Sequence, residues 1–352
     1  MVAHCEFSQV RRAENKKMAA IARFLRHNDL SLDTSVEVFI TVTRHDRLIA
    51  CGGIAGNIIK CVAIDECARG EGLALTLATE LIHLAYERSC IQLFIYTKSQ
   101  HEALFKQCGF YTLASVPGVM VLMENNATRL QRYASYLTTL RQPGNTVGCI
   151  VMNANPFTLG HRYLIQQAAA QCDWLHVFLV REDTSRFPYE DRLALVRAGS
   201  EDIAGVTVHR GSEYLISRAT FPCYFIKEQG VINHCYTEID LQIFRQHIAP
   251  ALGVTHRFVG SEPFCAVTAD YNRDMRRCLS DPILPAPPIA LVEIERVQYM
   301  GKAISASWVR QLLVKKEMTT LEQLVPPTTW RYLQQMLDPP GTPTFVSTTG
   351  EL

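Results

Sequence analysis

The sequence predicts an α/β protein built from two unlike halves. Its 352 residues are length for about two domains. In the first third, short alternating apolar and polar runs are interleaved with helical patterns, which is typical of a mixed α+β domain. From residue 147 on, strand-like runs alternate with helical patterns, which is typical of a parallel sheet with crossover helices. We therefore expect an α+β domain at 1–128, a linker helix and turn at 129–145, an α/β domain at 146–338 and a disordered tail at 339–352.

The elements of the first domain follow from the spacing of apolar residues. Residues 11–26 have helical spacing, and 36–42 alternate like a strand. A polar turn at 43–47 leads into a second strand at 48–54, so the two form a hairpin. Four leucines at helical spacing predict a long amphipathic helix after a glycine-containing turn: Leu73, Leu77, Leu81 and Leu84. The remaining expected elements are strands at 58–64, 91–96 and 119–123 and a short helix at 102–108.

The linker and the second domain follow in the same way. A helix at 128–141 ends at a Pro-Gly-Asn turn. Strands are expected at 147–152, 174–180, 206–209, 256–259 and 289–294. Helices are expected at 161–171, 189–201, 238–252, 268–279, 305–315 and 328–337.

Composition and charge exclude several classes of protein. Apolar residue types make up 48% of the chain and charged types 20%, which is unlike a disordered sequence. The net charge of +1 provides no field for nucleic acid or an anionic membrane. No apolar run approaches the roughly 18 residues of a membrane helix, and residues 1–7 lack a signal-peptide core. We expect a cytoplasmic protein that binds neither nucleic acid nor membrane.

The twelve cysteines predict neither a disulfide framework nor a metal centre. No two of them are spaced as C-x2-C, and most lie within apolar runs. We expect buried, reduced thiols and assign no metal-ligating residue.

The strongest chemical signal directly follows the first strand of the second domain. Residues 153–161 read NANPFTLGH and open a helix. Open α/β sheets bind ligands at the carboxyl ends of their strands, and a helix N-terminus offers free N–H groups to phosphate. Gly160 would let the chain pass close to a polyphosphate, and Thr158 and His161 would stabilise charge on the transferring phosphate.

A second segment, about 145 residues later, also carries residues that suit a phosphate. Residues 304–310 read ISASWVR, follow a strand and begin another helix. Ser305 and Ser307 lie in the first turn and Arg310 follows at i+3, so hydroxyls and guanidinium share one face that suits a leaving pyrophosphate. Taken alone, the two serines could be ordinary helix caps.

The two segments together resemble the signatures of the nucleotidylyltransferase superfamily, (H/T)xGH and ISSTxxR. The first is matched by Thr158, Gly160 and His161. The second is matched by Ile304, Ser305, Ser307 and Arg310, with Ser307 where threonine is usual. The resemblance implies a Rossmann-like nucleotidylyltransferase domain in which an acceptor attacks the α-phosphate of ATP and pyrophosphate leaves. Mg²⁺ would accompany ATP, held mainly by phosphate oxygens and water.

A glycine-rich turn in the first domain also suits a phosphate. Residues 69–74 read RGEGLA and lie between a strand and the long helix, where backbone N–H groups can hold a pyrophosphate. With the later segment LFKQCGF, it resembles the GNAT-type N-acetyltransferase fold over about residues 36–125. The resemblance implies that a CoA-like arm is held by Arg69, Gly70, Gly72 and Ala74. No residue stands out as a general base, so the domain either catalyses or only binds.

Nearly the whole chain resembles the citrate (pro-3S)-lyase ligase family. The stretches that carry the resemblance are 151–164, 217–227, 257–264 and 271–275. It implies that ATP, acetate and the thiol form of citrate lyase give AMP, pyrophosphate and acetylated lyase. The thiol would belong to a CoA-derived prosthetic group on the lyase's acyl carrier subunit. The chemistry agrees, because adenylation makes acetate a mixed anhydride that a thiolate attacks readily.

The resemblance assigns further roles to single residues. His161, Thr158 and Arg310 would be catalytic, and Ser305, Ser307 and Arg310 would bind the β- and γ-phosphates. Asn155 would support the turn or reach phosphate, and Gly260 and Glu262 would lie near adenosine. Lys227 would neutralise phosphate or hold the carboxylate, or it is simply a solvated surface lysine.

Two other enzymatic activities stay open at this point. One is adenylyl transfer to a small phosphate-bearing acceptor, against which the long first domain argues. The other is acetyl transfer from acetyl-CoA, with the second domain sensing nucleotide. Acetate follows from the resemblance alone.

Overall fold

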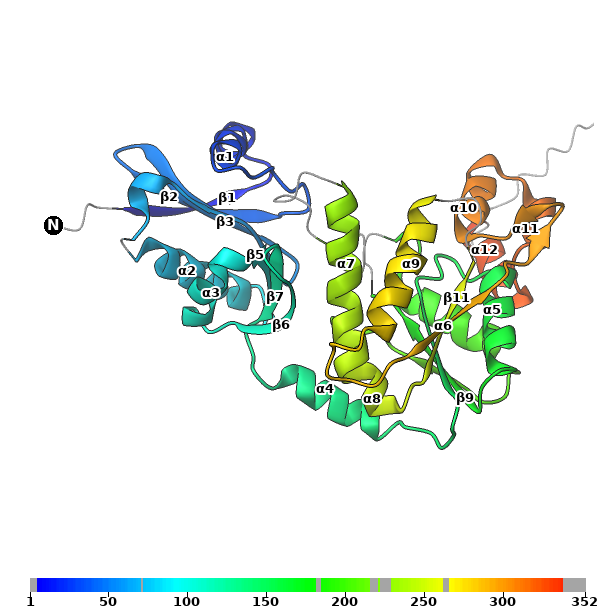
Figure 1. Cartoon of the computed structure of the whole chain (residues 1–352). Coiled ribbons are helices and arrows are strands. Elements are labelled where there is room, and N and C mark those ends of the chain that lie inside the picture. The colour runs from blue at the N-terminus through cyan, green and yellow to red at the C-terminus, as the bar shows by residue number, and fades with distance from the viewer. Residues whose placement is uncertain are drawn as a thin grey trace, which may run out of the picture. The chain divides into compact units, whose positions relative to one another are not determined.

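A computed structural model describes residues 5–70, 72–181, 185–215, 221, 229–261 and 266–337 (Figure 1). The chain forms two compact units. The first comprises residues 1–141, 220–252 and 270–288, and the second comprises 142–219, 253–269 and 289–352. The two units are groups of residues in contact, and segments beyond residue 146 belong to the first of them. The expected domain boundaries at 128 and 146 stay a prediction. The expected tail lies outside the described residues.

The first unit contains a seven-stranded sheet in the order β1-β2-β3-β4-β5-β7-β6. Its strands are β1 (Glu6–Arg11), β2 (Val38–Arg44), β3 (Arg47–Ala55), β4 (Ile58–Ile64), β5 (Phe94–Lys98), β6 (Tyr111–Val116) and β7 (Met120–Glu124). All neighbours are antiparallel except β4 and β5, which pair in parallel at Ile58↔Phe94 and Ile59↔Ile95. The mixed sheet confirms the predicted α+β fold of the first domain.

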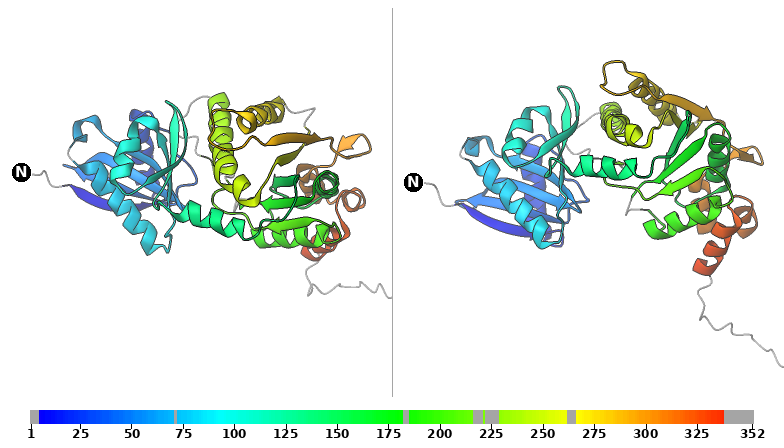
Figure 2. Two further views of the ribbon diagram at one scale, coloured as in Figure 1. Left: turned by 60° about the horizontal axis from the view of Figure 1, so that its bottom comes forward. Right: turned by 90° about the horizontal axis from the view of Figure 1, so that it is seen from below.

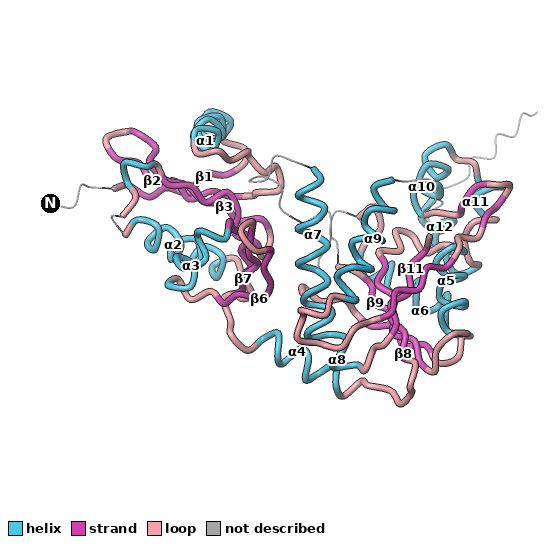
Figure 3. Tube along the Cα trace, in the orientation of Figure 1, coloured by secondary structure: helices cyan, strands magenta, loops and turns pink. Residues whose placement is uncertain are grey.

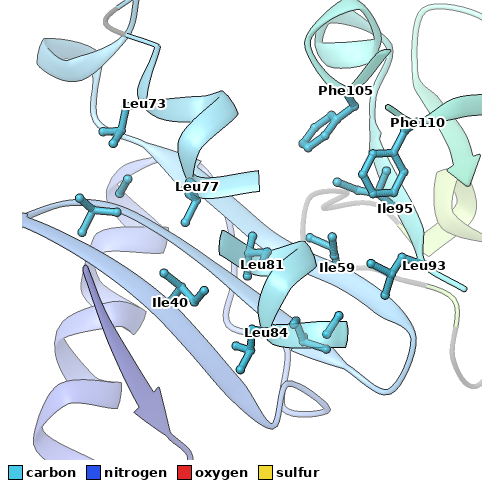
Figure 4. Close-up of a cluster of buried hydrophobic side chains, with 14 of the residues drawn as sticks. Ile40, Ile59, Leu73, Leu77, Leu81, Leu84, Leu93, Ile95, Phe105 and Phe110 are labelled. Carbon is cyan, nitrogen blue, oxygen red and sulfur yellow. The ribbon is translucent and has the colours of Figure 1, made fainter. Parts of the chain in front are cut away.

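Helices cover both faces of this sheet. On one face α2 (Leu73–Glu87) packs through its four leucines onto sheet residues that include Ile40 and Ile59 (Figure 4). Figure 2 shows the same helix against the sheet from two further directions. On the other face α1 (Asn15–His27) buries Ile21, Phe24 and Leu25 (Figure 1). The helical periodicity seen in the sequence thus marks the side that faces the sheet.

The first unit contains further helices. They are η1 (Glu66–Ala68), η2 (Ser99–His101), α3 (Glu102–Gln107), α4 (Arg129–Thr138), α7 (Gln229–Ile243), the π-helical turn η3 (Phe244–Ile248), α8 (Ala249–Leu252) and most of α9 (Ala266–Ser280). Helix α7 packs on the edge strand β6. There the side-chain amide of Gln242 accepts from the Ser115 N–H (3.1 Å) and donates to the Ser115 carbonyl (2.8 Å).

The second unit contains a five-stranded parallel sheet in the order β10-β9-β8-β11-β12. Its strands are β8 (Val147–Met152), β9 (Trp174–Leu179), β10 (Val206–His209), β11 (His256–Gly260) and β12 (Ala290–Ile294). This confirms the predicted parallel sheet. The strand order reverses direction between β8 and β11, which is where sheets of this kind bind ligands.

The helices of the second unit connect these strands and extend past the last one. They are α5 (Leu159–Ala169), α6 (Tyr189–Ser200), α10 (Ala306–Lys315), α11 (Met318–Glu322) and α12 (Pro327–Leu337). Figure 3 shows α5 beside strands β8, β9 and β11. A small hairpin of β13 (Gln298–Tyr299) and β14 (Lys302–Ala303) precedes α10. No helix in the described part of the chain is both long and apolar enough to span a bilayer.

Candidate active site

A pocket of about 290 Å³ opens in the second unit at the carboxyl ends of β11 and β12. This volume is close to the lower end of small-molecule sites, which begin at roughly 300 Å³. Four segments line it: residues 158–164, Gly260, residues 294–296 and residues 304–310. The fold therefore brings the two predicted motifs together, although about 145 residues separate them in sequence.

His161 lies in the first turn of α5, where the helix cap orients its ring. Thr158 is the N-cap residue and is fully buried. Its backbone N–H donates to Nδ1 of His161 (3.1 Å), and its hydroxyl lies 2.9 Å from the same nitrogen. Because a backbone N–H can only donate, Nδ1 must accept. We infer that the neutral ring carries its hydrogen on Nε2.

The surroundings of His161 favour this neutral form. Burial, and then the positive charge of Arg296, lower the pKa of His161 to about 4. The ring also stacks on buried Phe157, with centroids 5.8 Å apart and planes 16° apart. At neutral pH the side chain is thus a fixed, uncharged donor at the pocket wall.

Direct backbone contacts hold the two motifs together. A Cβ atom on Gly160 would lie 2.7 Å from the carbonyl oxygen of Ile304, so only glycine permits this approach. Arg310 on α10 donates to the carbonyl oxygen of Asn155. The Asn155 side chain accepts from the backbone N–H of Phe187 (3.3 Å) and so supports the turn. Gly160 therefore has a structural function at this contact, and its approach to a polyphosphate stays a prediction.

The start of α10 presents hydroxyls and free backbone N–H groups. Ser305 is the N-cap residue, and its hydroxyl accepts from the Trp308 N–H (3.2 Å). The hydroxyls of Ser305 and Ser307 lie 3.0 Å apart. No acidic side chain occupies the first turn of α10 or of α5. Both helix starts therefore suit an anion.

Sequence reasoning missed two arginines of this region. Arg296 lines the pocket directly after β12, and its only sequence signal is a charge at the carboxyl end of a parallel strand. Arg192 on α6 is fully buried and donates to the carbonyl oxygens of Asn153, Val180 and Phe187. It also donates to Oδ1 of Asn153 (2.5 Å). A guanidinium with this many acceptors fixes the turn that precedes α5.

The remaining predicted nucleotide-binding residues divide into two groups. Gly260 lines the pocket at the end of β11. Glu262 and Lys227 lie outside the described residues.

The predicted CoA-binding loop belongs to the first unit, between η1 and α2. Gly70 and Gly72 have φ angles of +85° and +77°, and a Cβ atom at either would meet nothing within 4 Å. The loop therefore needs glycine for its backbone conformation and leaves its surface open. Exposed Arg69 contacts the Ile64 carbonyl (3.3 Å) and Glu66 (3.4 Å). Ala74 lies in the first turn of α2.

Comparisons with known proteins agree on one family. Residues 147–333 match the family described as citrate lyase ligase C-terminal domain. The chain is 74% identical over 332 residues to the citrate (pro-3S)-lyase ligase of Escherichia coli (strain K12), with 94% of each chain covered. It is 51% identical to the same ligase of Klebsiella pneumoniae, with 92% of this chain and 95% of the relative covered. An acyl-CoA N-acyltransferase structure from Pseudomonas aeruginosa is similar over 35% of this chain and 100% of its own, with 15% identity and a TM-score of 0.30. The chain therefore belongs to the citrate lyase ligase family, whose members are enzymes of the ligase class.

Proposed function

We propose that this ligase activates acetate as acetyl-AMP and transfers the acetyl group to a thiol of citrate lyase. The thiol is that of the CoA-derived prosthetic group on the acyl carrier subunit. The observation that carries the proposal is the second unit's pocket, which unites His161, Arg310 and the N-termini of α5 and α10. Family membership favours this activity over both alternatives considered from the sequence.

The residues around the pocket fit ATP as a substrate. Backbone N–H groups, two hydroxyls and a guanidinium are the groups that bind phosphate oxygens in proteins. Ser305, Ser307 and Arg310 would hold the β- and γ-phosphates at the start of α10. Gly260 and Glu262 would lie near adenosine, and Lys227 would contact a phosphate or the carboxylate.

His161 would act on the phosphate that is transferred. Its Nε2–H can donate to an α-phosphate oxygen and stabilise the charge that develops there. Thr158 has its hydroxyl and its N–H engaged with the ring, so it would act as a positioning residue for His161. Asn155 and Gly160 would hold the turn and the start of α10 in register.

The two chemical steps balance without an oxidant or a reductant. An acetate oxygen forms a bond to the α-phosphorus while the bond to pyrophosphate breaks, which gives acetyl-AMP. The thiolate then attacks the acetyl carbon, and AMP leaves with the electron pair of the broken bond. Mg²⁺ bound to phosphate oxygens and water would neutralise charge on the leaving pyrophosphate. We assign it no protein ligand.

The first unit would bind the CoA-like arm. The open loop that contains Arg69, Gly70 and Gly72 and the first turn of α2 at Ala74 offer backbone N–H groups to a pyrophosphate. Strand β4 pairs with β5 at Ile58–Phe94 and Ile59–Ile95, which lie at the start of β4. The end of β4 leads into the loop. Backbone groups at that end of the strand would meet the amides of such an arm.

The deciding experiment is acid-dependent exchange between ATP and labelled pyrophosphate. We expect exchange with acetate, little with buffer alone, and its loss in His161→Ala. His83→Ala, which changes an exposed histidine on α2, is the matched control. Thioester formation on purified acyl carrier subunit then tests the second step. Absence of exchange with any small acid, for folded enzyme that binds ATP, would refute acetyl-AMP formation.

A further inference from the structure

Arg296 is placed to contact a substrate. It follows β12 by two residues, lines the pocket with His161 and Ser305, and is half-buried. Its side chain runs over the end of β11, because a Cβ atom on Gly260 would lie 3.3 Å from Nε and 3.6 Å from Cγ of Arg296. Gly260 therefore leaves the space through which this guanidinium reaches the pocket.

The charge of Arg296 acts at the position where the transferred phosphate is expected. It is one of the two causes of the low pKa of His161, so the guanidinium and the imidazole are near neighbours. Burial also lowers the pKa of Arg296 itself. An arginine nevertheless remains protonated at neutral pH, so Arg296 brings a positive charge to the pocket wall.

The proposed reaction brings two anions together, the triphosphate of ATP and the carboxylate of the acid. Their mutual repulsion must be offset by fixed positive charge at the meeting point. Arg310 supplies one guanidinium, but it also holds the Asn155 carbonyl. A second guanidinium next to His161 would supply planar, bidentate donors suited to either oxyanion.

We propose that Arg296 is a substrate-binding residue that holds an anionic oxygen beside His161. The ligand is a phosphate of ATP or the carboxylate of the small acid, and both present the same oxyanion to the guanidinium. The identification of these two anions rests on the proposed function. The placement of Arg296 rests on the pocket and on Gly260.

The test measures the affinities for the two substrates separately. ATP is titrated calorimetrically into the full-length wild type, Arg296→Gln and Arg296→Lys, and the KM for acetate is then measured by pyrophosphate exchange. A charged hydrogen bond predicts a roughly 10- to 100-fold weakening in Arg296→Gln. Arg296→Lys keeps the charge and should lose less. Arg331→Gln, an exposed arginine on α12 outside the pocket, is the matched control.

Each outcome decides the question. A higher Kd for ATP identifies a phosphate ligand, and a higher KM for acetate alone identifies the carboxylate. Values of both constants within threefold of the control would overturn the proposal. If the wild type binds ATP but exchanges no pyrophosphate, the proposed function fails. In that case the Kd for ATP alone tests Arg296, and an unchanged Kd in Arg296→Gln overturns its role as well. Circular dichroism verifies folding, and Arg296→Lys provides the same comparison if Arg296→Gln fails to fold.

Discussion

The backbone carbonyl of Ile304 lies against the α-carbon of Gly160, with room for no side chain between them. A Cβ atom there would approach the oxygen to 2.7 Å, and no rotation of a side chain can relieve a clash with backbone. Gly160 thus sets the spacing between the starts of α5 and α10. The glycine of the first motif therefore contacts the backbone of the second motif.

Replacing Gly160 by alanine should separate the two halves of the pocket. We expect Gly160→Ala to cost about 1–3 kcal/mol in unfolding free energy, as overpacking does, and to lower pyrophosphate exchange at least tenfold. Urea unfolding and exchange kinetics measure the two effects. A variant with wild-type exchange would show that the close approach of the helices is dispensable.

The low pKa of His161 predicts an unusual pH profile. The ring is neutral above its pKa of about 4, so Nδ1 accepts from the Thr158 N–H throughout pH 6–8 and the ring stays oriented. At saturating substrates, the His161 contribution to kcat should therefore stay constant across this range. It should be lost only as the pH falls toward 4, where a proton on Nδ1 breaks the hydrogen bond that orients the ring. His161→Ala should lower kcat by about 10²–10³-fold, as removal of one oxyanion donor does. A wild-type limb centred near 6.5 would contradict the neutral assignment.

A second histidine pair predicts acid-dependent stability. His176 on β9 and His209 on β10 are buried, with Nδ1 of one 2.8 Å from Nε2 of the other, and burial lowers the pKa of both to about 4. Between pH 4 and the usual value of about 6.5, the unfolded chain binds protons that the folded chain does not. Stability should therefore be complete above pH 6.5 and fall as the pH drops toward 4. Thermal unfolding at pH 5 and pH 7 measures this, and the difference should shrink in His176→Leu/His209→Leu but persist in His83→Leu.

We expect replacement of buried Arg192 to lower the unfolding free energy much more than replacement of exposed Arg210 in the same unit. Arg192→Leu would leave the carbonyls of Asn153, Val180 and Phe187 without this donor. Unsatisfied buried groups cost about 1–3 kcal/mol each, so we expect a loss of at least about 3 kcal/mol in unfolding free energy and reduced exchange. The control Arg210→Leu removes an exposed pair with Glu190 and should cost less than about 1 kcal/mol. Equal losses in the two variants would be inconsistent with a structural role for Arg192.

The loop of the first unit predicts a separation of the two half-reactions. Gly72→Ala introduces a side chain at φ +77°, which costs about 1–2 kcal/mol and distorts the loop. Gly72→Ala and Arg69→Ala should slow thioester formation and spare pyrophosphate exchange. Gly118→Ala, at φ +73° in the turn between β6 and β7, imposes the same kind of strain away from the loop. Parallel loss of both half-reactions in Gly72→Ala would argue against arm binding by this loop.

The sequence predicts those elements whose burial is periodic. Strand β4 is predicted with its observed bounds, and α2 is predicted because its leucines all face the sheet. Strand β1 is not predicted, because only Val10 of its six residues is buried and no alternation arises. Strand β6, α11 and the hairpin β13–β14 are also missed, and α7 begins at Gln229, before the predicted start at 238. Strand β1 is defined by its pairing with β2, more than 25 residues along the chain, and β13 and β14 have only two residues each, too few for a periodic pattern.

The candidate site shows the same division. His161, Ser305 and Arg310 are found because each stands in a recognisable local motif. Arg296 is a single charge after a strand, and its proximity to His161 arises only when β12 joins the sheet beside β11. The function of Gly160 as a contact to Ile304 is likewise a property of two segments that no local pattern connects.

The contact between Gln242 and Ser115 has a consequence for the behaviour of the chain at high concentration. A carboxamide presents the same donor and acceptor as a peptide group, so Gln242 occupies the place of one residue of an incoming strand. Exposed sheet edges are templates for intermolecular β-pairing and aggregation. At β6 another molecule would first have to displace α7, so this helix and its Gln242 side chain together protect the edge against polymerisation.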